Sequence, residues 1–546
     1  MSVHDGKVGG MRRPYRTVRH RLALRVVAVG RRLPTGARHG LRRAGDSLRR
    51  PNLPRRLSAG PVEIVTEFDH WETIERIADT LVASLSSGGV EVVRLQRDGS
   101  IVVAVGKKHR AAALDVLAAD LATSGWYVQG SRRRASRLDT RRYPGGDNLR
   151  VFRRLVTPAG VPVADADCGV ALQFWRNAPE GSRRPDGGKF SAGTRLAPAR
   201  NGVAAYITPA LWQEAQGDKK RFLRPSAPPH LLSLNEPVDI VYTWVDDSDP
   251  AWQRRRAGVR PASTHSSDAL QSARTRNRDE LRYSLRSLAM YAGWFRHIWL
   301  VTDGQVPDWL AEHPRLTVVT HREIFADPEA LPTFNSHAIE SQLHHIDGLS
   351  EHFLYLNDDV FFGRPVRPEL FFAGNGVAKF AIAPIAIDRQ AVPGPLNGAM
   401  AAARNNRDLL AADLGRAVTH RLQHTPHAHI RSSLAHLEAS HPEAIAKVAR
   451  SRFRDVADYS VASELGHYWG YAHGRAVTTR FGFRYVDIGS ERMPEYLDSL
   501  LALRDQDCFC INDTGPYRRP PDDARITEFL TRYFPVASPF ERVGAA

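Results

Sequence analysis

The chain is poor in cysteine and has no long apolar run. Three cysteines occur among 546 residues, Cys168, Cys508 and Cys510, and their odd number and tight C-x-C spacing favour reduced thiols over a disulfide framework or a zinc site. No stretch approaches the roughly 20 apolar residues of a membrane-spanning helix. The apolar piece at 26–29 is too short, and too closely flanked by arginine, for a signal sequence. These absences predict a cytoplasmic protein.

Acidic residues are almost missing from residues 1–60. This leader holds 16 Arg and Lys against two Asp, and so carries +14 of the net charge of +17. A nucleic-acid-binding protein would carry its basic face on a folded domain, so this distribution argues against nucleic acid as a partner. Two interpretations of the leader stay open. It is either disordered, or a basic amphipathic segment that contacts anionic lipid peripherally at the inner face of the plasma membrane.

Residues 61–230 show no catalytic constellation. Their pattern predicts a small α+β accessory domain that ends in a Pro-rich linker. Its first half reads as a βαββα unit, with strands at 62–65, 90–95 and 101–105 and helices at 70–85 and 109–124.

The pattern changes in residues 237–541, which we interpret as the catalytic domain. Strands are expected at 238–245, 298–302, 316–320 and 353–356, and helices at 279–291, 307–312, 337–346 and 409–422. Nearly continuous apolar strands that alternate with helices predict an α/β fold, a mostly parallel sheet covered on both faces. Ligands of such sheets bind beyond the carboxyl ends of the strands.

The segment FLYLNDDVFFG at 353–363 places two carboxylates inside an apolar run. Burial of an ionised carboxylate costs several kcal/mol unless a cation or several donors compensate it. Asp358 and Asp359 therefore suit either a metal that holds a phosphate or a sharp turn that solvates both groups. The first strand of the domain also ends in acidic residues, Asp246 and Asp247. This coincidence favours the metal or nucleotide site.

The predicted helix at 337–346 has one polar face. At about 100° per residue, His337, Glu340 and His344 fall within about 60° of one another, opposite an apolar face. A solvated face is the commoner explanation of such a pattern. Two imidazoles and a carboxylate that lead directly into the acidic turn favour a functional one.

The segment HTPHAH groups three histidines, His424, His427 and His429. Their spacing matches a zinc site poorly, and Pro426 argues for a loop. A proton shuttle or a phosphate donor is the favoured interpretation.

Two later segments offer groups that suit phosphate and metal. Arg452 and Arg454 have planar guanidinium groups that fit bidentate phosphate contacts, although an exposed basic loop would look the same. Near the C-terminus another apolar run ends in Asn512 and Asp513, as the strand before Asp358 does.

These segments resemble the four characteristic regions of the Stealth family. That family comprises bacterial capsular and cell-wall polysaccharide phosphotransferases, and includes the catalytic subunit of the animal enzyme that begins the mannose 6-phosphate tag on lysosomal hydrolases. The resemblance covers roughly 237–541, and one departure is Asp247, where the family usually has glycine. The matching segments are VDIVYTWVDDSDPAW, RNRDELRYSLRSL, LVTDGQVPDWL, LPTFNSHAIESQLHHIDGLSEHFLYLNDDVFFG, HTPH, RFRD, CINDT and FPVASPFE.

The resemblance implies a nucleotide-diphospho-sugar-binding sheet and a hexose-1-phosphate transferase. Such an enzyme transfers a sugar 1-phosphate from a UDP-sugar to a hydroxyl of a glycan or lipid-linked glycan, forms a phosphodiester and releases UMP. It requires Mg²⁺ or Mn²⁺ and serves capsular polysaccharide or exopolysaccharide synthesis. The alternatives are a metal-dependent glycosyltransferase that releases UDP and, less favoured, a non-catalytic sugar-nucleotide-binding module.

Phosphoryl transfer depends mainly on the positioning of the reactants and on the neutralisation of phosphate charge. With this chemistry, the segments above indicate three groups of site residues. The expected metal ligands are Asp358, Asp359, Asn512 and Asp513. The expected catalytic residues are His424 as the general base, Asp359 and His337. The expected substrate-binding residues are Asp246, Arg282, Glu340, His344, His427, Arg452 and Arg454.

Overall fold

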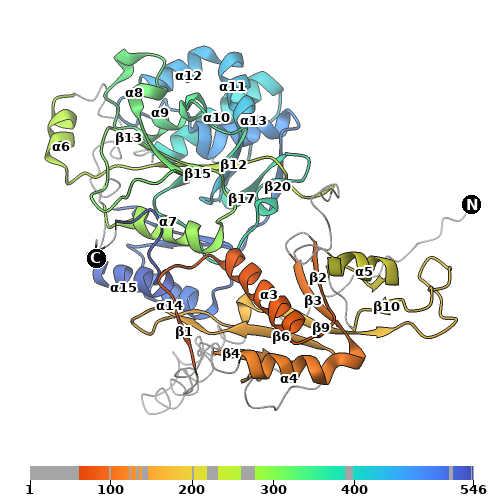
Figure 1. Ribbon diagram of the computed structural model, residues 1–546. Coiled ribbons are helices and arrows are strands. Elements are labelled where there is room, and N and C mark those ends of the chain that lie inside the picture. Colours follow the sequence, from red (N-terminus) through yellow and green to blue (C-terminus); the bar gives the residue numbers. More distant parts are fainter. Residues whose placement is uncertain are drawn as a thin grey trace, which may run out of the picture. The chain divides into compact units, whose positions relative to one another are not determined.

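The computed structural model describes residues 61–97, 100–121, 125–130, 135–137, 146–198, 202–217, 231–259, 277–387, 398–515, 521–542 and 544. The predictions for the leader and for the Pro-rich linker therefore lie outside the described residues. Residues 61–497 and 505–546 form one compact unit, whose elements are labelled in Figure 1. None of the described helices combines the length and the apolar character needed to cross a membrane.

The predicted βαββα order is present at the start of the described chain. The helices are α3 (His70–Ser87), α4 (Arg110–Leu121) and α5 (Pro209–Gly217), with 3-10 turns at Lys107–His109 and Ala166–Cys168. The longer strands are β2 (Val92–Arg97), β3 (Ser100–Gly106), β4 (Trp126–Gln129), β6 (Asn148–Arg153) and β9 (Val170–Asn177), and the short strands are β1 (Glu63–Ile64), β5 (Ala135–Arg137), β7 (Leu155–Val156), β8 (Pro162–Ala164), β10 (Arg195–Leu196) and β11 (Tyr206–Ile207).

The strands of this region form two sheets. One has the order β1-β7-β8, and the other runs β11-β10-β9-β6-β4-β5, with β3 pairing both β9 and β2. Leu81 of α3 and Leu117 of α4 pack on Val103 and Val151 in one apolar core. Trp212 of α5 packs in a second core with Leu95. Helices therefore cover both faces of the larger sheet.

A five-stranded sheet organises the rest of the molecule. Its order is β14-β13-β12-β15-β19, with neighbouring strands parallel except the antiparallel β15–β19 pair. The strands are β12 (Val238–Thr243), β13 (Ile298–Thr302), β14 (Leu316–Thr320), β15 (His352–Asn357) and β19 (His427–Ile430). This confirms the prediction of a mostly parallel sheet.

Helices lie on both faces of this sheet, as Figure 1 shows. On one face Tyr242 of β12 contacts Ser284 of α7, with 2.8 Å between the two hydroxyl oxygens. On the other face Val241 and Tyr355 pack in one core with Leu410, Leu434 and other residues of α10–α13. The helices described from residue 231 onward are α6 (Pro250–Ala257), α7 (Glu280–Tyr291), α8 (His321–Ile324), α9 (Ser336–Glu340), α10 (Gly398–Leu414), α11 (Arg431–Ser440), α12 (Pro442–Ala449), α13 (Gly466–Ala472), α14 (Met493–Leu503) and α15 (Asp523–Tyr533), and not all of them lie on this sheet.

Two smaller sheets complete this region. One has the order β16-β22-β21, and the other β18-β17-β20. Their strands are β16 (Val360–Phe362), β17 (Ala378–Ala386), β18 (His420–Leu422), β20 (Ala476–Thr479), β21 (Phe483–Asp487) and β22 (Cys508–Asn512). The turn at Asp358 and Asp359 joins β15 of the large sheet to β16. Because β16 pairs with β22, with Val360 opposite Cys510, the turn lies beside the C-terminal part of the chain.

The predicted helix at 307–312 is wrong. The segment forms a turn at 308–309, and Leu310 makes an isolated antiparallel bridge with Glu541. The pairing of Leu310 with a segment more than 200 residues away replaces the helix that the apolar pattern of 307–312 predicts.

Two other predicted helices end earlier than expected. The one at 409–422 ends in α10 at Leu414, where Gly415 has a φ of 63° that ends the helix; His420–Leu422 is instead strand β18. The one at 337–346 breaks after Glu340 and continues as a 3-10 turn at Leu343–His345. The Ser341 hydroxyl donates to the Ala338 carbonyl at 2.7 Å, a local bond that competes with the helix.

Candidate active site

The candidate site lies where the order of the parallel sheet reverses. From β12 the chain adds β13 and β14 on one side, and then returns to place β15 on the other side of β12. Open α/β sheets bind ligands at such a switch point, beyond the carboxyl ends of the strands. Asp246 follows β12, and Asp358 and Asp359 follow β15. The acidic residues predicted from the sequence therefore lie at this reversal.

Asp359 is the residue on which the site converges. Its Oδ2 atom accepts hydrogen bonds from Asn512 Nδ2 at 2.8 Å and from the Cys510 thiol at 3.2 Å. Its Oδ1 atom lies 3.4 Å from His424 Nε2. The structure therefore brings together three residues that the sequence predicted separately, Asp359, His424 and Asn512. Cys510 was missed, although it lies two positions before Asn512 in β22 and so faces the same side.

Carboxylates crowd the turn. Burial raises the pKa of Asp358 well above its usual value, and the charges of Glu280 and Asp359 raise it further. Glu280, the first residue of α7, is also buried, and burial raises its pKa to about 7. Sequence analysis missed Glu280, because a glutamate in the first turn of a helix is usually explained by the helix dipole.

The site fits a divalent cation. His424 Nε2 and Asp359 Oδ1 are both buried, and neither has a hydrogen-bond partner among the described residues. Asp359 Oδ1, the Asp358 carboxylate and the amide oxygen of Asn512 offer oxygen donors beside this crowded group of carboxylates. Clustered carboxylates with raised pKa values are stabilised by a bound metal ion. Asp359, His424 and Cys510 offer ligand atoms that lie within 4.8 Å of one another.

Arg278 is the cation at the edge of this cluster. It pairs with Asp513, with 2.8 Å between Nη2 and Oδ2, and with Asp523, with 2.8 Å between Nε and Oδ1. Its Nη1 atom lies 3.7 Å from Glu280 Oε1. Asp513, predicted as a metal ligand, therefore forms an ion pair with Arg278. In the sequence, Arg278 could have been identified as a partner of Glu280 because it lies two residues before it in the RNRDEL segment.

Behind His424 lies a group of buried histidines. His427 Nδ1 is 3.1 Å from His467 Nε2, and the ring of His467 stacks on His429 with centroids 4.3 Å apart. Burial lowers the pKa of His427 and of His467 well below the usual value. These imidazoles are therefore neutral, and they pack behind the partly exposed His424, whose ring centroid is 6.1 Å from that of His427.

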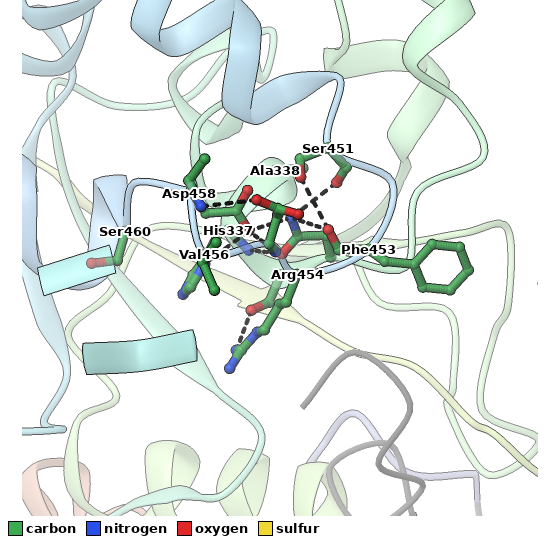
Figure 2. Close-up of polar contacts among 12 residues, drawn as sticks. His337, Ala338, Ser451, Phe453, Arg454, Val456, Asp458 and Ser460 are labelled. Atoms are coloured by element: carbon green, nitrogen blue, oxygen red, sulfur yellow. Dashed lines mark hydrogen bonds and ion pairs between the residues drawn. The ribbon is translucent and has the colours of Figure 1, made fainter. Parts of the chain in front are cut away.

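A buried network centred on Asp458 fixes the segment that carries the two predicted arginines (Figure 2). Asp458 Oδ2 accepts from Asn335 Nδ2 at 2.8 Å and from the backbone N–H of Asp455 at 2.9 Å. Asn335 Nδ2 also donates to the carbonyls of Ser451 and Phe453. His337 Nδ1 lies 3.4 Å from the same Asp458 oxygen. His337 thus lies in the network that supports the loop.

The two arginines of this loop make different contacts. Arg454 Nη2 donates to the Ser336 hydroxyl at 2.6 Å. Arg452 Nη2 donates to the backbone carbonyls of Glu329 at 2.8 Å and Leu331 at 3.1 Å.

Tyr355 of β15 connects this loop to the acidic turn. Burial raises its pKa well above the usual value, the charges of Glu340 and Asp358 raise it, and the charge of Arg454 lowers it. These three charged groups, each predicted as a site residue, therefore lie near enough to Tyr355 to shift its pKa. Glu340 Oε2 accepts from the Ser463 hydroxyl at 2.7 Å, which ties α9 to the π-helical turn at Val461–Leu465.

Three predicted substrate-binding residues have other partners. His344 Nε2 lies 2.7 Å from Glu438 of α11, because the break after Glu340 turns it out of the predicted face. Arg282 Nε pairs with Glu541 Oε2 at 2.6 Å. Asp246 Oδ1 accepts from the backbone N–H of Ser248 at 2.9 Å and from its hydroxyl, and so stabilises its own turn.

Four family models match the chain, and all describe conserved regions of Stealth proteins. Conserved region 1 matches residues 236–264, region 2 matches 274–380, region 3 matches 423–471 and region 4 matches 498–546. Asp246, the Asp358–Asp359 turn, His424 and Asn512 each lie in a different one of these regions.

Curated relatives are identical to the chain at 40–50% of the aligned positions, over alignments of 310–501 residues. An exopolysaccharide phosphotransferase of Streptomyces coelicolor is 41% identical over 501 residues, 88% of this chain and 52% of the relative. The exopolysaccharide phosphotransferase CpsY of Mycobacterium tuberculosis is 40% identical over 401 residues, 73% of this chain and 74% of the relative. The chain spans about half the length of the first of these relatives.

Among solved structures, the chain is similar to the galactosyltransferase LgtC in complex with donor and acceptor sugar analogs. The identity is 13%, the match covers 54% of this chain and 95% of LgtC, and the TM-score is 0.28.

Proposed function

The chain belongs to the Stealth family, and from this premise we propose that it is a hexose-1-phosphate transferase of capsular polysaccharide or exopolysaccharide synthesis. The donor is a UDP-sugar and the acceptor a hydroxyl of a glycan or lipid-linked glycan. The products are a phosphodiester and UMP. The observation that carries this proposal is the convergence of Asp359, His424 and Asn512 at the switch point of a parallel sheet.

The acidic turn provides the place for Mg²⁺ or Mn²⁺. Asp358, Asp359 and Asn512 offer the oxygen ligands that these ions prefer, and Asp513 adds another when it releases Arg278. The ion, when bound, neutralises charge on the diphosphate of the donor. Glu280 supports the site from the first turn of α7.

His424 is the group that we assign as general base. The acceptor oxygen forms a bond to the β-phosphorus of the donor, the bond from that phosphorus to the bridging oxygen of UMP breaks, and the hydroxyl proton moves to His424 Nε2. Asp359 Oδ1, at 3.4 Å, stabilises the imidazolium that forms. His337 acts less directly, because it faces Asp458 in the network that holds the arginine loop.

The remaining predicted residues are assigned to substrate binding. The Ser336 hydroxyl orients Arg454. The charge of Arg454 lowers the pKa of Tyr355, as it would for a guanidinium near the acidic turn, and a guanidinium there suits contact with phosphate oxygens. Asp246, at the end of β12, suits contact with the nucleotide. Arg452, Glu340 and His427 shape the surrounding loops, and Arg282 and His344 act through their carboxylate partners, Glu541 and Glu438.

The test of this function is the identity of the released nucleotide. The purified chain is incubated with a panel of UDP-sugars, a glycan acceptor and Mg²⁺, and the nucleotides are separated. UMP together with a phosphodiester in the glycan supports the proposal. UDP instead of UMP identifies a glycosyltransferase, and binding without either product identifies a non-catalytic module.

The proposed place of action is the cytoplasmic face of the membrane. UDP-sugars are cytoplasmic metabolites, and the leader carries +14 of the charge of the chain. Contact of residues 1–60 with anionic lipid would bring the enzyme to lipid-linked acceptors.

A further inference from the structure

A second cluster of metal-ligating side chains lies outside the site described above. His344 and His345 of the 3-10 turn at Leu343–His345 direct their Nε2 atoms at the same oxygen of Glu438 in α11. The distances from Glu438 Oε2 are 2.7 Å to His344 and 2.8 Å to His345. This cluster shares no residue with the group of Asp359, His424 and Cys510.

Hydrogen bonding fixes which nitrogen of His345 is available. His345 Nδ1 lies 3.0 Å from the carbonyl oxygen of Ile324, the last residue of α8. A carbonyl oxygen only accepts, so Nδ1 carries a proton and donates it. Facing the Glu438 carboxylate, Nε2 carries either a second proton, as in an ion pair, or a metal ion. An Nδ1–H donated to a backbone carbonyl is the usual support of a metal-bound histidine.

His344 is compatible with the same role. Its side chain is 3% exposed, and its Nδ1 atom has no hydrogen-bond partner among the described residues. The Nε2 atom hydrogen-bonds to Glu438 in the metal-free chain, so a metal ion at Nε2 takes the place of that proton, and the proton of the neutral ring moves to Nδ1.

Glu438 supplies both charge and room for adjustment. It lies in the last turn of α11, where the helix dipole also attracts a cation. Tetrahedral zinc sets its ligand atoms about 3.3 Å apart, given bond lengths of about 2.0–2.1 Å. The present separations are somewhat shorter, and the Glu438 side chain, which is 31% exposed, can move outward to reach that spacing.

We propose that His344, His345 and Glu438 bind one Zn²⁺ ion, with water in the remaining coordination position. Two imidazoles and one carboxylate are a recognised zinc ligand set, and imidazole nitrogen disfavours Mg²⁺. The ion links the 3-10 turn to α11, and His345 extends the link to α8; Figure 1 shows α8 and α11 on the same side of the sheet. The turn lies six residues before β15, which ends at Asn357 next to Asp358, so the zinc ion holds the segment that precedes the active-site strand.

The test measures zinc uptake by the full-length, untagged chain after chelator treatment. Asp359→Asn and His424→Gln are both introduced first, so that the active-site group does not contribute. In this background we expect one tightly bound Zn²⁺ per chain by equilibrium dialysis with metal analysis, and a rise in Tm when Zn²⁺ is added. Since the readout is binding, it is independent of the proposed transferase activity.

Two further variants distinguish a zinc site from an ion pair. His345→Arg keeps a positive charge opposite Glu438 but offers no ligand, and Glu438→Gln removes the charged ligand. Loss of a residue that only hydrogen-bonds to a metal ligand weakens metal binding by roughly 10- to 100-fold. Each of these variants loses a ligand itself, so we expect zinc affinity to fall by more than this and the rise in Tm on zinc addition to disappear. His345→Arg is expected to keep the metal-free Tm of its parent. Absence of stoichiometric zinc in the background chain, or unchanged zinc binding in both variants, overturns the proposal.

Discussion

At the scale of single residues, Asp359 connects the two strands that build the site. Its carboxylate contacts Asn512, Cys510 and His424, which come from two distant parts of the chain. The pKa of the adjacent Asp358 is raised by burial and by the charges of Glu280 and Asp359. The two aspartates therefore differ in their surroundings, with Asp359 the one that faces the proposed base.

Replacing Asp359 by asparagine tests this position. Asp359→Asn keeps the size of the side chain but removes the charge near His424, and we expect kcat for UMP release in Mg²⁺ to fall by about 100-fold or more. The exposed Asp347→Asn, which changes the same charge away from the site, should keep wild-type turnover. Mg²⁺-dependent turnover that survives in Asp359→Asn would show that Asp359 is not a metal ligand.

Glu280 gives a prediction for pH. Burial raises its pKa to about 7 in the folded chain, from 4.5 for a free side chain. Between these values the folded state holds a proton that the unfolded state has lost, so its contribution to stability is complete below pH 4.5 and disappears as pH rises through 7. Relative to Glu280→Gln, which stays neutral, the wild type should lose free energy of unfolding from pH 5 to pH 8.

Denaturant unfolding without divalent metal, at both pH values, measures this difference. The contributions of other titrating groups to the pH dependence are the same in both proteins and cancel in the comparison. One of these groups is Glu464, because burial also raises its pKa to about 7. A gap between wild type and Glu280→Gln that does not change with pH would mean that Glu280 is already ionised at pH 5.

At the scale of elements, the α9 segment and the arginine loop are held by one asparagine. Asn335 caps α9 through Oδ1, which accepts from the backbone N–H of His337 at 3.0 Å. Its Nδ2 atom donates to Asp458 and to two carbonyls of the arginine loop. The position of Arg454 therefore depends on a residue that carries no charge.

Asn335→Ala should destabilise the protein. The change removes a helix cap and the buried hydrogen bonds that Nδ2 donates to Asp458 and to the arginine loop, and we expect a loss of about 3 kcal/mol in the free energy of unfolding. Ser336→Ala is the matched control, because Ser336 is the next residue and contacts Arg454 but lies outside the Asp458 network. Its expected cost is below about 1 kcal/mol. Equal losses in the two variants, measured by denaturant titration, would contradict the role assigned to Asn335.

The parallel strands could be predicted from sequence, while several helices could not. Apolar and β-branched runs such as 298–302 mark a buried strand locally, and β13 has these same bounds. The segment 307–312 depends instead on pairing with Glu541, and the direction of His344 depends on a break at Ser341. Sequence periodicity carries no information about such long-range or irregular contacts.

The candidate site was predictable in its charged residues but not in their pairing. Asp358 and Asp359 stand out because two carboxylates interrupt an apolar run. Glu280 and Cys510 do not stand out, because each has an ordinary explanation in its own element. Only the tertiary arrangement, β22 beside β16 and α7 beside the turn, reveals that they face the same carboxylates.

At the scale of the whole molecule, charge is concentrated in residues 1–60. The remaining residues are nearly neutral, since the leader carries +14 of the net +17. A segment of this charge attracts anionic lipid by about 1 kcal/mol for each basic residue near the surface, an attraction that salt weakens.

Deletion of residues 1–60 should remove binding to anionic vesicles. We expect the full chain to sediment with phosphatidylserine vesicles at low salt and to dissociate at high salt, and the shortened chain to stay in solution. UMP release with a water-soluble acceptor should be the same for both. Equal sedimentation of the two chains would exclude the leader as the lipid contact.

The pairing of β16 with β22 has a consequence for protein synthesis. Asn512 lies 153 positions after Asp359, to which it donates. The ribosome therefore synthesises the four parallel strands and the acidic turn long before β22, the strand that supplies Cys510 and Asn512, leaves the exit tunnel. During this interval the nascent chain carries Asp358 and Asp359 without β22, the strand that supplies their partners. The active site is therefore assembled last. A chain released before β22 is synthesised lacks the complete site, although the four parallel strands of its central sheet are present.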